Sequence, residues 1–258
     1  MNRILRGRKE RGGLRAAGAA AAAALVLGGC AATQTMLAKK DLDVQTRTST
    51  AVFVDPVARD KRTIYLDIKS GVMEFDRRKF KQFVSEQFTQ FNDNGYKIID
   101  DPDKAQFQMV VYVLNLEKAS PTAAEQALHQ GYMGGAVLAG ATAGAVMGGN
   151  VKSAAIGGVA AGGAEFITGS LVKDVTYMLV ADVQIKEKAA PGVIVRKDTK
   201  VDTKVSDAGS SQQRVSEVTD KKEYRTRIVT TANKANLKLE DAQDLMFQKT
   251  AYAMSGFF

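Results

Sequence analysis

Apolar and polar residues alternate in several short stretches of the chain, which is the pattern of half-buried β-strands. The alternation occurs at residues 51–54, 63–68, 96–99, 106–116, 175–185, 193–205 and 223–231. In the stretch 106–116 both sets of alternate positions are apolar, so we expect a strand that is covered on both faces at the centre of a sheet. Residues 206–213 are rich in Ser and Gln and are expected to form a loop.

Two segments follow the helical period instead. The first begins after Asp76, which is a plausible N-cap, and ends near Asn94-Gly95. Phe80, Val84 and Phe88 fall on one face of that helix. The second covers residues 239–255. Together the patterns predict an α+β fold, with a mainly antiparallel sheet and flanking amphipathic helices, formed by residues 51–128 and 173–258.

A Gly/Ala-rich tract interrupts this pattern at residues 129–172. Of the 42 residues from 131 to 172, 22 are Gly or Ala, and residues 131–151 carry no charge. At about 1.5 Å per residue, that uncharged run forms a helix of about 30 Å, which matches the hydrocarbon core of a bilayer. A polar break at residues 149–152 divides the tract. We therefore predict a helical hairpin, inserted between two central strands and projecting into the membrane.

Glycines at four-residue spacing give the predicted hairpin two packing seams. They are Gly140, Gly144, Gly148, Gly158 and Gly162. Such spacing lets helix backbones approach closely and favours self-association in a membrane. The alternative is a flexible Gly-rich loop, although a loop of this length is uncommon inside a compact domain. Because the tract leaves a strand near Lys118 and re-enters one near Asp174, we expect both of its ends at the same edge of the sheet.

The beginning of the chain has the pattern of a bacterial lipoprotein signal. Residues 1–15 carry six basic side chains, and the apolar run 16–27 is too short to remain as a membrane-spanning helix. The run ends in Leu27-Gly28-Gly29-Cys30, and Cys30 is the only cysteine. We expect a signal peptide at 1–29, a covalent lipid on Cys30 and a polar tether over 30–50. The simpler alternative is a buried structural cysteine.

The net charge of +8 has little bearing on function, because the predicted signal peptide accounts for most of it. Residues 1–29 carry six basic side chains and one acidic one, which leaves about +3 for the remainder. We therefore expect no nucleic-acid partner. A single cysteine also excludes a disulfide within the chain, so packing and assembly must supply the stability.

The sequence contains no constellation that points to catalysis. His129 is the only histidine, so the base that usually activates a nucleophile, and the ligands of a zinc site, are both scarce. Neither G-x-x-x-x-G-K-[ST] nor G-x-G-x-x-G occurs. We expect no catalytic residues, no metal and no cofactor other than the lipid on Cys30, and therefore no enzyme.

Several motifs, in order along the chain, resemble the TraT family of outer-membrane lipoproteins. They include Lys39-Lys40-Asp41-Leu42-Asp43-Val44, Thr63-Ile64-Tyr65-Leu66-Asp67-Ile68-Lys69, Gly95-Tyr96-Lys97-Ile98-Ile99, Pro102-Asp103-Lys104-Ala105, Gly131-Tyr132, Asp174-Val175-Thr176-Tyr177-Met178, Asp182-Val183-Gln184-Ile185, Thr226-Arg227-Ile228-Val229 and Ala232-Asn233-Lys234-Ala235-Asn236-Leu237. Residues 189–223 diverge from the family pattern.

The resemblance implies surface exclusion in bacterial conjugation, that is, blocking of DNA entry from related donors, together with resistance to complement. It further implies a ring-shaped homo-oligomer at the outer membrane, where Ala31 after Cys30 also favours sorting. The implied partners are other copies of the chain, outer-membrane lipid, and the conjugative pilus or donor-cell surface. The alternative class is a structural, pore-forming or plug-forming assembly of the envelope.

Overall fold

A computed structural model describes residues 39–90, 95–134, 173–205 and 209–258 of the chain. A six-stranded sheet is the main feature, with the strand order β1-β8-β5-β4-β2-β3. These strands are β1 (Asp43–Thr48), β2 (Thr63–Ser70), β3 (Lys97–Ile99), β4 (Phe107–Lys118), β5 (Asp174–Lys188) and β8 (Lys221–Ala235). A second sheet contains only β6 (Val195–Val205) and β7 (Gly209–Thr219). A short 3-10 helix, η1 (Arg59–Lys61), precedes β2.

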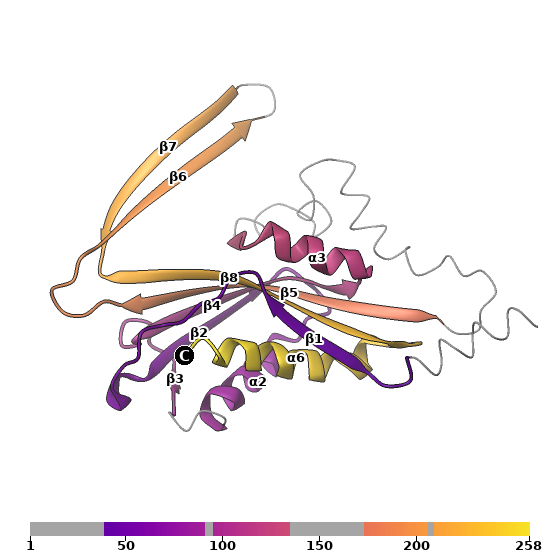
Figure 1. The fold of residues 1–258 in the computed structure, drawn as a ribbon. Helices are drawn as coiled ribbons and strands as arrows, with labels where there is room; N and C mark the ends of the chain where they lie inside the picture. Colours follow the sequence, from indigo (N-terminus) through magenta and orange to yellow (C-terminus); the bar gives the residue numbers. More distant parts are fainter. Residues whose placement is uncertain (1–38, 91–94, 135–172, 206–208) are drawn as a thin grey trace, which may run out of the picture.

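Helices cover both faces of the six-stranded sheet (Figure 1). The helices α2 (Arg77–Gln90) and α6 (Leu239–Ser255) lie on one face, and α3 (Pro121–Gln130) lies on the other. Alternation along the strands divides the buried residues accordingly: Leu179, Ala181 and Val183 of β5 face the α2/α6 layer, whereas Met178 and Val180 face α3. The sheet is therefore the middle layer of three.

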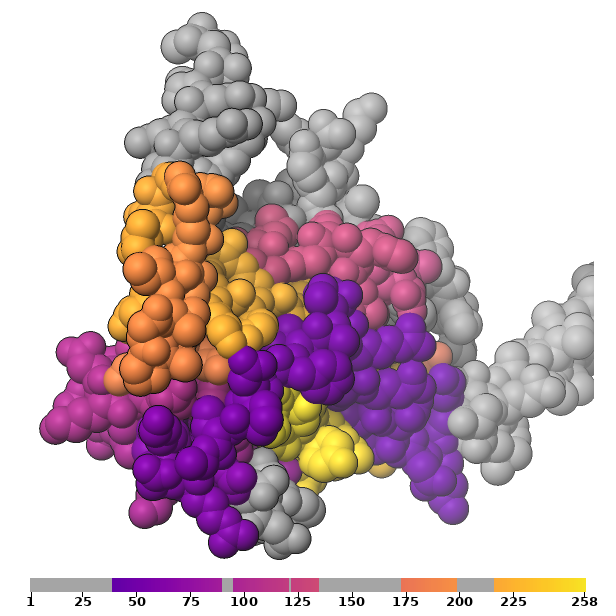
Figure 2. Space-filling view, turned by 60° about the vertical axis from the view of Figure 1, so that its left-hand side comes forward, coloured from indigo at the N-terminus to yellow at the C-terminus, as the bar shows by residue number. Residues whose placement is uncertain are grey.

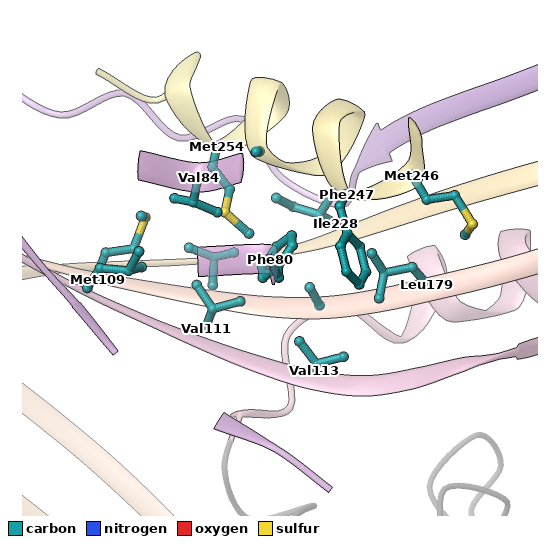
Figure 3. Packing of buried hydrophobic residues seen from close by; sticks show 14 of the residues in the cluster. Phe80, Val84, Met109, Val111, Val113, Leu179, Ile228, Met246, Phe247 and Met254 are labelled. Carbon is teal, nitrogen blue, oxygen red and sulfur yellow. The ribbon is translucent and has the colours of Figure 1, made fainter. Parts of the chain in front are cut away.

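The larger core lies between the sheet and the α2/α6 layer (Figure 3). Phe75, Phe80 and Phe247 pack edge to face there, with ring centroids 5.1–5.2 Å apart. Phe80, Val84 and Phe88 are fully buried, as expected for residues spaced four apart on one helical face. The predicted N-cap of α2 is confirmed, because the Asp76 carboxylate accepts hydrogen bonds from the backbone N–H groups of Arg78 and Lys79.

The α+β class and most of the expected elements are confirmed. β2, β3, β4, β5, β6, β8, α2 and α6 all overlap the segments for which the sequence pattern predicted them. β4, for which both faces are apolar, indeed lies inside the sheet between β5 and β2.

The expectation of a mainly antiparallel sheet is confirmed, because β1, β8, β5 and β4 pair antiparallel. The exception is β2, which pairs parallel with both β3 and β4. The reason is that α2 carries the chain from the end of β2 back across one face before β3 begins. Such a crossover makes the strands on either side of the helix parallel.

Four segments differ from their expected local structure. Residues 51–54 form no strand, and the Val54 N–H donates to the carbonyl of Phe257 at 3.0 Å. β1 occurs instead within the segment expected to be a tether, and it was missed because Val44 is its only apolar residue. β7 begins within the Ser/Gln-rich segment expected to be a loop, and α3 was not predicted at all. The strands β1 and β7 were missed because their side chains are mostly polar, although their backbones pair with neighbouring strands.

Replacing Phe247 by alanine should destabilise the protein strongly, since this side chain fills the space between α2, α6 and the sheet. We expect the free energy of unfolding, measured by urea denaturation, to fall by about 3–5 kcal/mol. Tyr252→Ala on the same helix is the matched control, because Tyr252 is 61% exposed. It should change stability by less than about 0.5 kcal/mol. Equal losses for the two variants would contradict the packing described here.

Candidate functional site

A pair of opposite charges is buried between the sheet and α3. Asp182 stands in the middle of β5 and Arg227 in β8, directly opposite in the strand register. Both side chains are completely buried. The Arg227 Nε donates to Asp182 Oδ1 at 2.6 Å, and Nη2 donates to Oδ2 at 3.1 Å. This two-pronged geometry is the strongest form of an arginine–carboxylate contact.

Arg227 also binds the end of α3. Its Nη1 donates to the carbonyl of Ala127 at 3.1 Å and, at 3.5 Å, to the side-chain oxygen of Gln130. The carbonyl of Ala127 is one of the last four of the helix, which lack partners within it. A cation at this end also interacts favourably with the helix dipole. Arg227 therefore fixes the position of α3 on the sheet.

Asp182 in turn holds the backbone that follows α3. Its Oδ2 accepts hydrogen bonds from the N–H groups of Met133 at 2.6 Å and Gly134 at 2.7 Å. Together with the two contacts from Arg227, four N–H groups surround one carboxylate. Burial of a charge is unfavourable unless it is paired and hydrogen-bonded, and this arrangement meets both conditions.

Gly134 fits this place for a steric reason. Its φ of +67° is in the left-handed region, and a Cβ added there would lie 2.6 Å from the hydroxyl of Tyr132. Tyr132 itself packs its ring 5.3 Å from the guanidinium of Arg225. Burial raises the pKa of Tyr132 to about 12, although the nearby Arg225 opposes the shift. The side chain is therefore neutral over the physiological pH range.

The chain re-enters the described structure at a different place. The Lys173 N–H donates to the side-chain oxygen of Asn236 at 2.9 Å, and the Asn236 N–H donates to the Lys173 carbonyl at 2.7 Å. Lys118, where the chain leaves β4, is opposite Tyr177 near the start of β5, so the chain leaves and re-enters the sheet at the same end, as expected. The helix α3 then carries the chain back over the sheet, and Met133 and Gly134 lie beside Asp182. Asp182 is eight residues beyond Asp174, the first residue of β5, which is about 26 Å at the usual rise per residue of a strand.

The predicted site residues mostly lie outside the described residues. This is so for Cys30, for the signal peptide, and for Gly140, Gly144, Gly148, Gly158 and Gly162. His129 is described, and it is exposed in the last turn of α3. Sequence analysis did not single out Asp182 and Arg227, although a charge within an otherwise apolar strand is a usable signal of a buried pair.

A groove of about 240 Å³ runs beside α3, over the strands β1, β8 and β5. It is lined by polar side chains, among them Asn233, whose amide group donates to Asp174 and Thr176. Arg47 and Glu125 form an ion pair between β1 and α3 beside the groove. No group of three or more His, Cys, Asp or Glu residues suited to a metal ion occurs within the described ranges.

The fold and this network define a class of protein: a three-layer α+β domain whose central ion pair holds the start of an inserted Gly/Ala-rich tract. The chain belongs to the TraT family. The family profile described as Enterobacterial TraT complement resistance protein matches residues 41–258. The resemblance noted in the sequence motifs is thereby confirmed.

Individual relatives agree with the family profile. A TraT complement resistance protein of Escherichia coli is 34% identical over 235 residues, which cover 90% of this chain and 92% of the relative. A second, from Escherichia coli strain K12, is 31% identical over 233 residues, which cover 90% and 92%. The names refer to complement resistance and to no catalytic activity.

None of the helices in the described part of the chain combines the length and the apolar character needed to cross a membrane. The predicted membrane hairpin falls almost wholly at residues 135–172, outside the described ranges.

Breaking the central ion pair should be costly. Arg227→Met leaves the buried carboxylate of Asp182 without its cation, and we expect the free energy of unfolding to fall by about 3–5 kcal/mol. The double variant Asp182→Leu/Arg227→Met should lose less than Arg227→Met alone, because no unpaired charge then remains. Urea denaturation of the purified variants measures both.

The matched control is Arg225→Met, two residues earlier in β8, where the side chain is exposed and its ion pair with Glu223 contributes about 1 kcal/mol or less. A loss below about 1 kcal/mol for Arg227→Met would contradict a structural role of the pair.

Proposed function

We propose that this chain is an outer-membrane lipoprotein that protects the cell surface against complement. The observation that carries this proposal is the match to the TraT family over residues 41–258, together with relatives that are named for complement resistance at 31–34% identity over nine-tenths of the chain. Coverage of 92% of those relatives supports transfer of the role of a whole protein rather than that of one shared module.

The proposal includes a lipid anchor at Cys30. The basic residues 1–15, the short apolar run and the small residues Gly28-Gly29 before this single cysteine support it. Dual acylation is enough for stable anchoring, so the lipid on Cys30 would hold the protein at the membrane surface. The Gly/Ala-rich tract is proposed as a second anchor, and its glycine spacing supports self-association of several copies.

Surface exclusion is the second activity that we propose, on the resemblance to TraT proteins. Both surface exclusion and complement resistance are activities of the cell surface, where the proposed lipid anchor would hold the protein. Lipid anchoring and self-association would therefore serve both activities, and the same set of strains can test both.

Removal of the gene should lower survival in active serum, and the wild-type gene should restore it. Cys30→Ala should fail to restore survival, because the protein would no longer be sorted to the outer membrane. Cell fractionation of each strain verifies the location, and heat-treated serum, in which complement is inactive, is the control that should leave all strains equally viable. Equal survival with and without the gene would contradict the complement proposal.

The exclusion proposal is tested by mating the same strains, as recipients, with a donor that carries a related conjugative element. Transfer should rise when the gene is removed and fall when the wild-type gene is returned. Equal transfer frequencies would refute exclusion while leaving the serum result intact.

A further inference from the structure

The strand β2 has an open edge over more than half of its length. β3 pairs only with residues 63–65 of β2, whereas β4 pairs with β2 to its end. After Ile99 the chain turns away from β2, and the Ala105 N–H donates to the Asp101 carbonyl at 3.2 Å. Residues 66–70 therefore lie at the edge of the sheet, with no strand beside them among the described residues.

The strand register identifies the backbone groups that are free at this edge. The Lys97 N–H donates to the Arg62 carbonyl at 2.9 Å, so the Arg62 carbonyl points toward β3. Alternate residues of a strand direct their N–H and C=O groups to the same side, so Leu66, Ile68 and Ser70 share this direction. β3 ends before it reaches Ile68, whose N–H and C=O groups have no backbone partner in the described part of the chain. Such groups are available to an added strand.

A groove of about 770 Å³ lies beside the open edge. It runs between residues 65–68 of β2 and the first turns of α2, and Phe75 and Asp100 also line it. The β6–β7 hairpin rises on the α3 side of the sheet (Figures 1 and 2), and none of its described residues lines the groove. The groove therefore leaves room for an extended segment next to β2.

Three cations line the α2 side of the groove: Arg77, Arg78 and Lys81. Lys79 of the same turn pairs with Asp244 of α6, but no ion pair of the three groove cations occurs among the described residues. The first turn of α2 contains no acidic residue, and cations at this end of a helix oppose its dipole. The three side chains therefore do not stabilise α2, which favours a role in binding.

The three carboxylates in the lining compensate these cations only in part. The Asp76 carboxylate accepts hydrogen bonds from two backbone N–H groups at the start of α2. Asp67 lies 3.5 Å from Lys69, and both alternate with Leu66 and Ile68 of β2, so they belong to the opposite face of the strand. The third carboxylate, Asp100, follows the last residue of β3. The α2 side of the groove is therefore cationic, whereas the other side is mixed.

We propose that an extended acidic segment of another protein adds to the open edge of β2 and fills this groove. Its backbone pairs with the free N–H and C=O groups of Ile68. Its acidic side chains, at alternate positions, meet Arg77, Arg78 and Lys81, and the side chains between them face the Asp67 side and are uncharged. In strand addition, main-chain hydrogen bonds provide affinity and alternate side chains provide specificity.

This contact goes beyond the function proposed above. It requires neither the lipid on Cys30 nor the Gly/Ala-rich tract, because every residue that forms it belongs to β2, α2 or the turn between them. The serum and mating experiments therefore do not decide it, and binding has to be measured directly.

Fluorescence anisotropy with the full-length protein in detergent provides that measurement. The probe is a short labelled peptide in which Thr and Glu alternate, so that an extended strand carries all of its charge on one face. We expect this peptide to bind, and its affinity to fall as salt screens the charges. A peptide in which Thr and Lys alternate is the control, and it should not bind.

Charge reversal tests the contribution of the cations. Arg77→Glu/Arg78→Glu should weaken binding of the acidic peptide at least about tenfold, because attraction becomes repulsion at two positions. Lys61→Glu/Lys249→Glu is the matched control, since both lysines are exposed outside the groove and the net charge changes equally. Its affinity should stay within about twofold of that of the wild-type protein.

Ile68→Pro tests the backbone pairing. Proline lacks the N–H group that the added strand would use, but it leaves the pairing with β4 intact, because the Ile68 N–H points away from β4. Binding should fall about tenfold, as expected for the loss of a hydrogen bond. Ile68→Val keeps the N–H group and should bind like the wild-type protein.

Several results would overturn the proposal. One is absence of binding by the acidic peptide, and another is equal affinity for the acidic and basic peptides. Binding that occurs only after oligomers are dissociated would show that a second copy of the chain fills the groove instead. Unchanged affinity of Ile68→Pro, with a wild-type circular dichroism spectrum, would exclude strand addition. If Ile68→Pro does not fold, unchanged affinity of Arg77→Glu/Arg78→Glu would still refute the acidic partner.

Discussion

The ion pair between Asp182 and Arg227 is the constraint on which the α3 face of the protein depends. Two opposite charges buried in the middle of a sheet are tolerated only if every donor and acceptor around them is satisfied. Here the partners come from three parts of the chain: the adjacent strands β5 and β8, the end of α3, and the backbone at Met133 and Gly134. The requirement for these partners fixes α3, and with it the point from which the Gly/Ala-rich tract departs.

The two faces of the sheet consequently have different roles. On the α2/α6 face, an aromatic and aliphatic core supplies most of the buried apolar area, and its energetics are non-directional (Figure 3). On the α3 face the apolar cluster is small, and directional polar contacts set the geometry. The apolar core on the α2/α6 face stabilises the fold. The polar contacts on the α3 face position α3 and the residues that follow it.

The sequence pattern predicted those helices and strands whose apolar side chains are buried and whose polar side chains are exposed. β4 is apolar on both faces, β5 has apolar residues at alternate positions and α2 has one apolar face, so each was recognised. β1 and β7 were not recognised. Backbone hydrogen bonds hold them to β8 and β6, and such bonds form whether the side chains are polar or apolar. The parallel pairing of β2 depends on the route of α2 across the sheet. The candidate site was missed for a related reason: only the fold brings Asp182, Arg227 and Gly134 together.

The most direct measurement is amide hydrogen exchange at Met133 and Gly134. If the Asp182 carboxylate holds these two N–H groups, they are protected to about the same degree as the amides of α3, and Asp182→Asn removes that protection while the amides of β2 remain protected. Fast exchange at Met133 and Gly134 in the wild-type protein, or protection unchanged by Asp182→Asn, would contradict the role assigned to the pair.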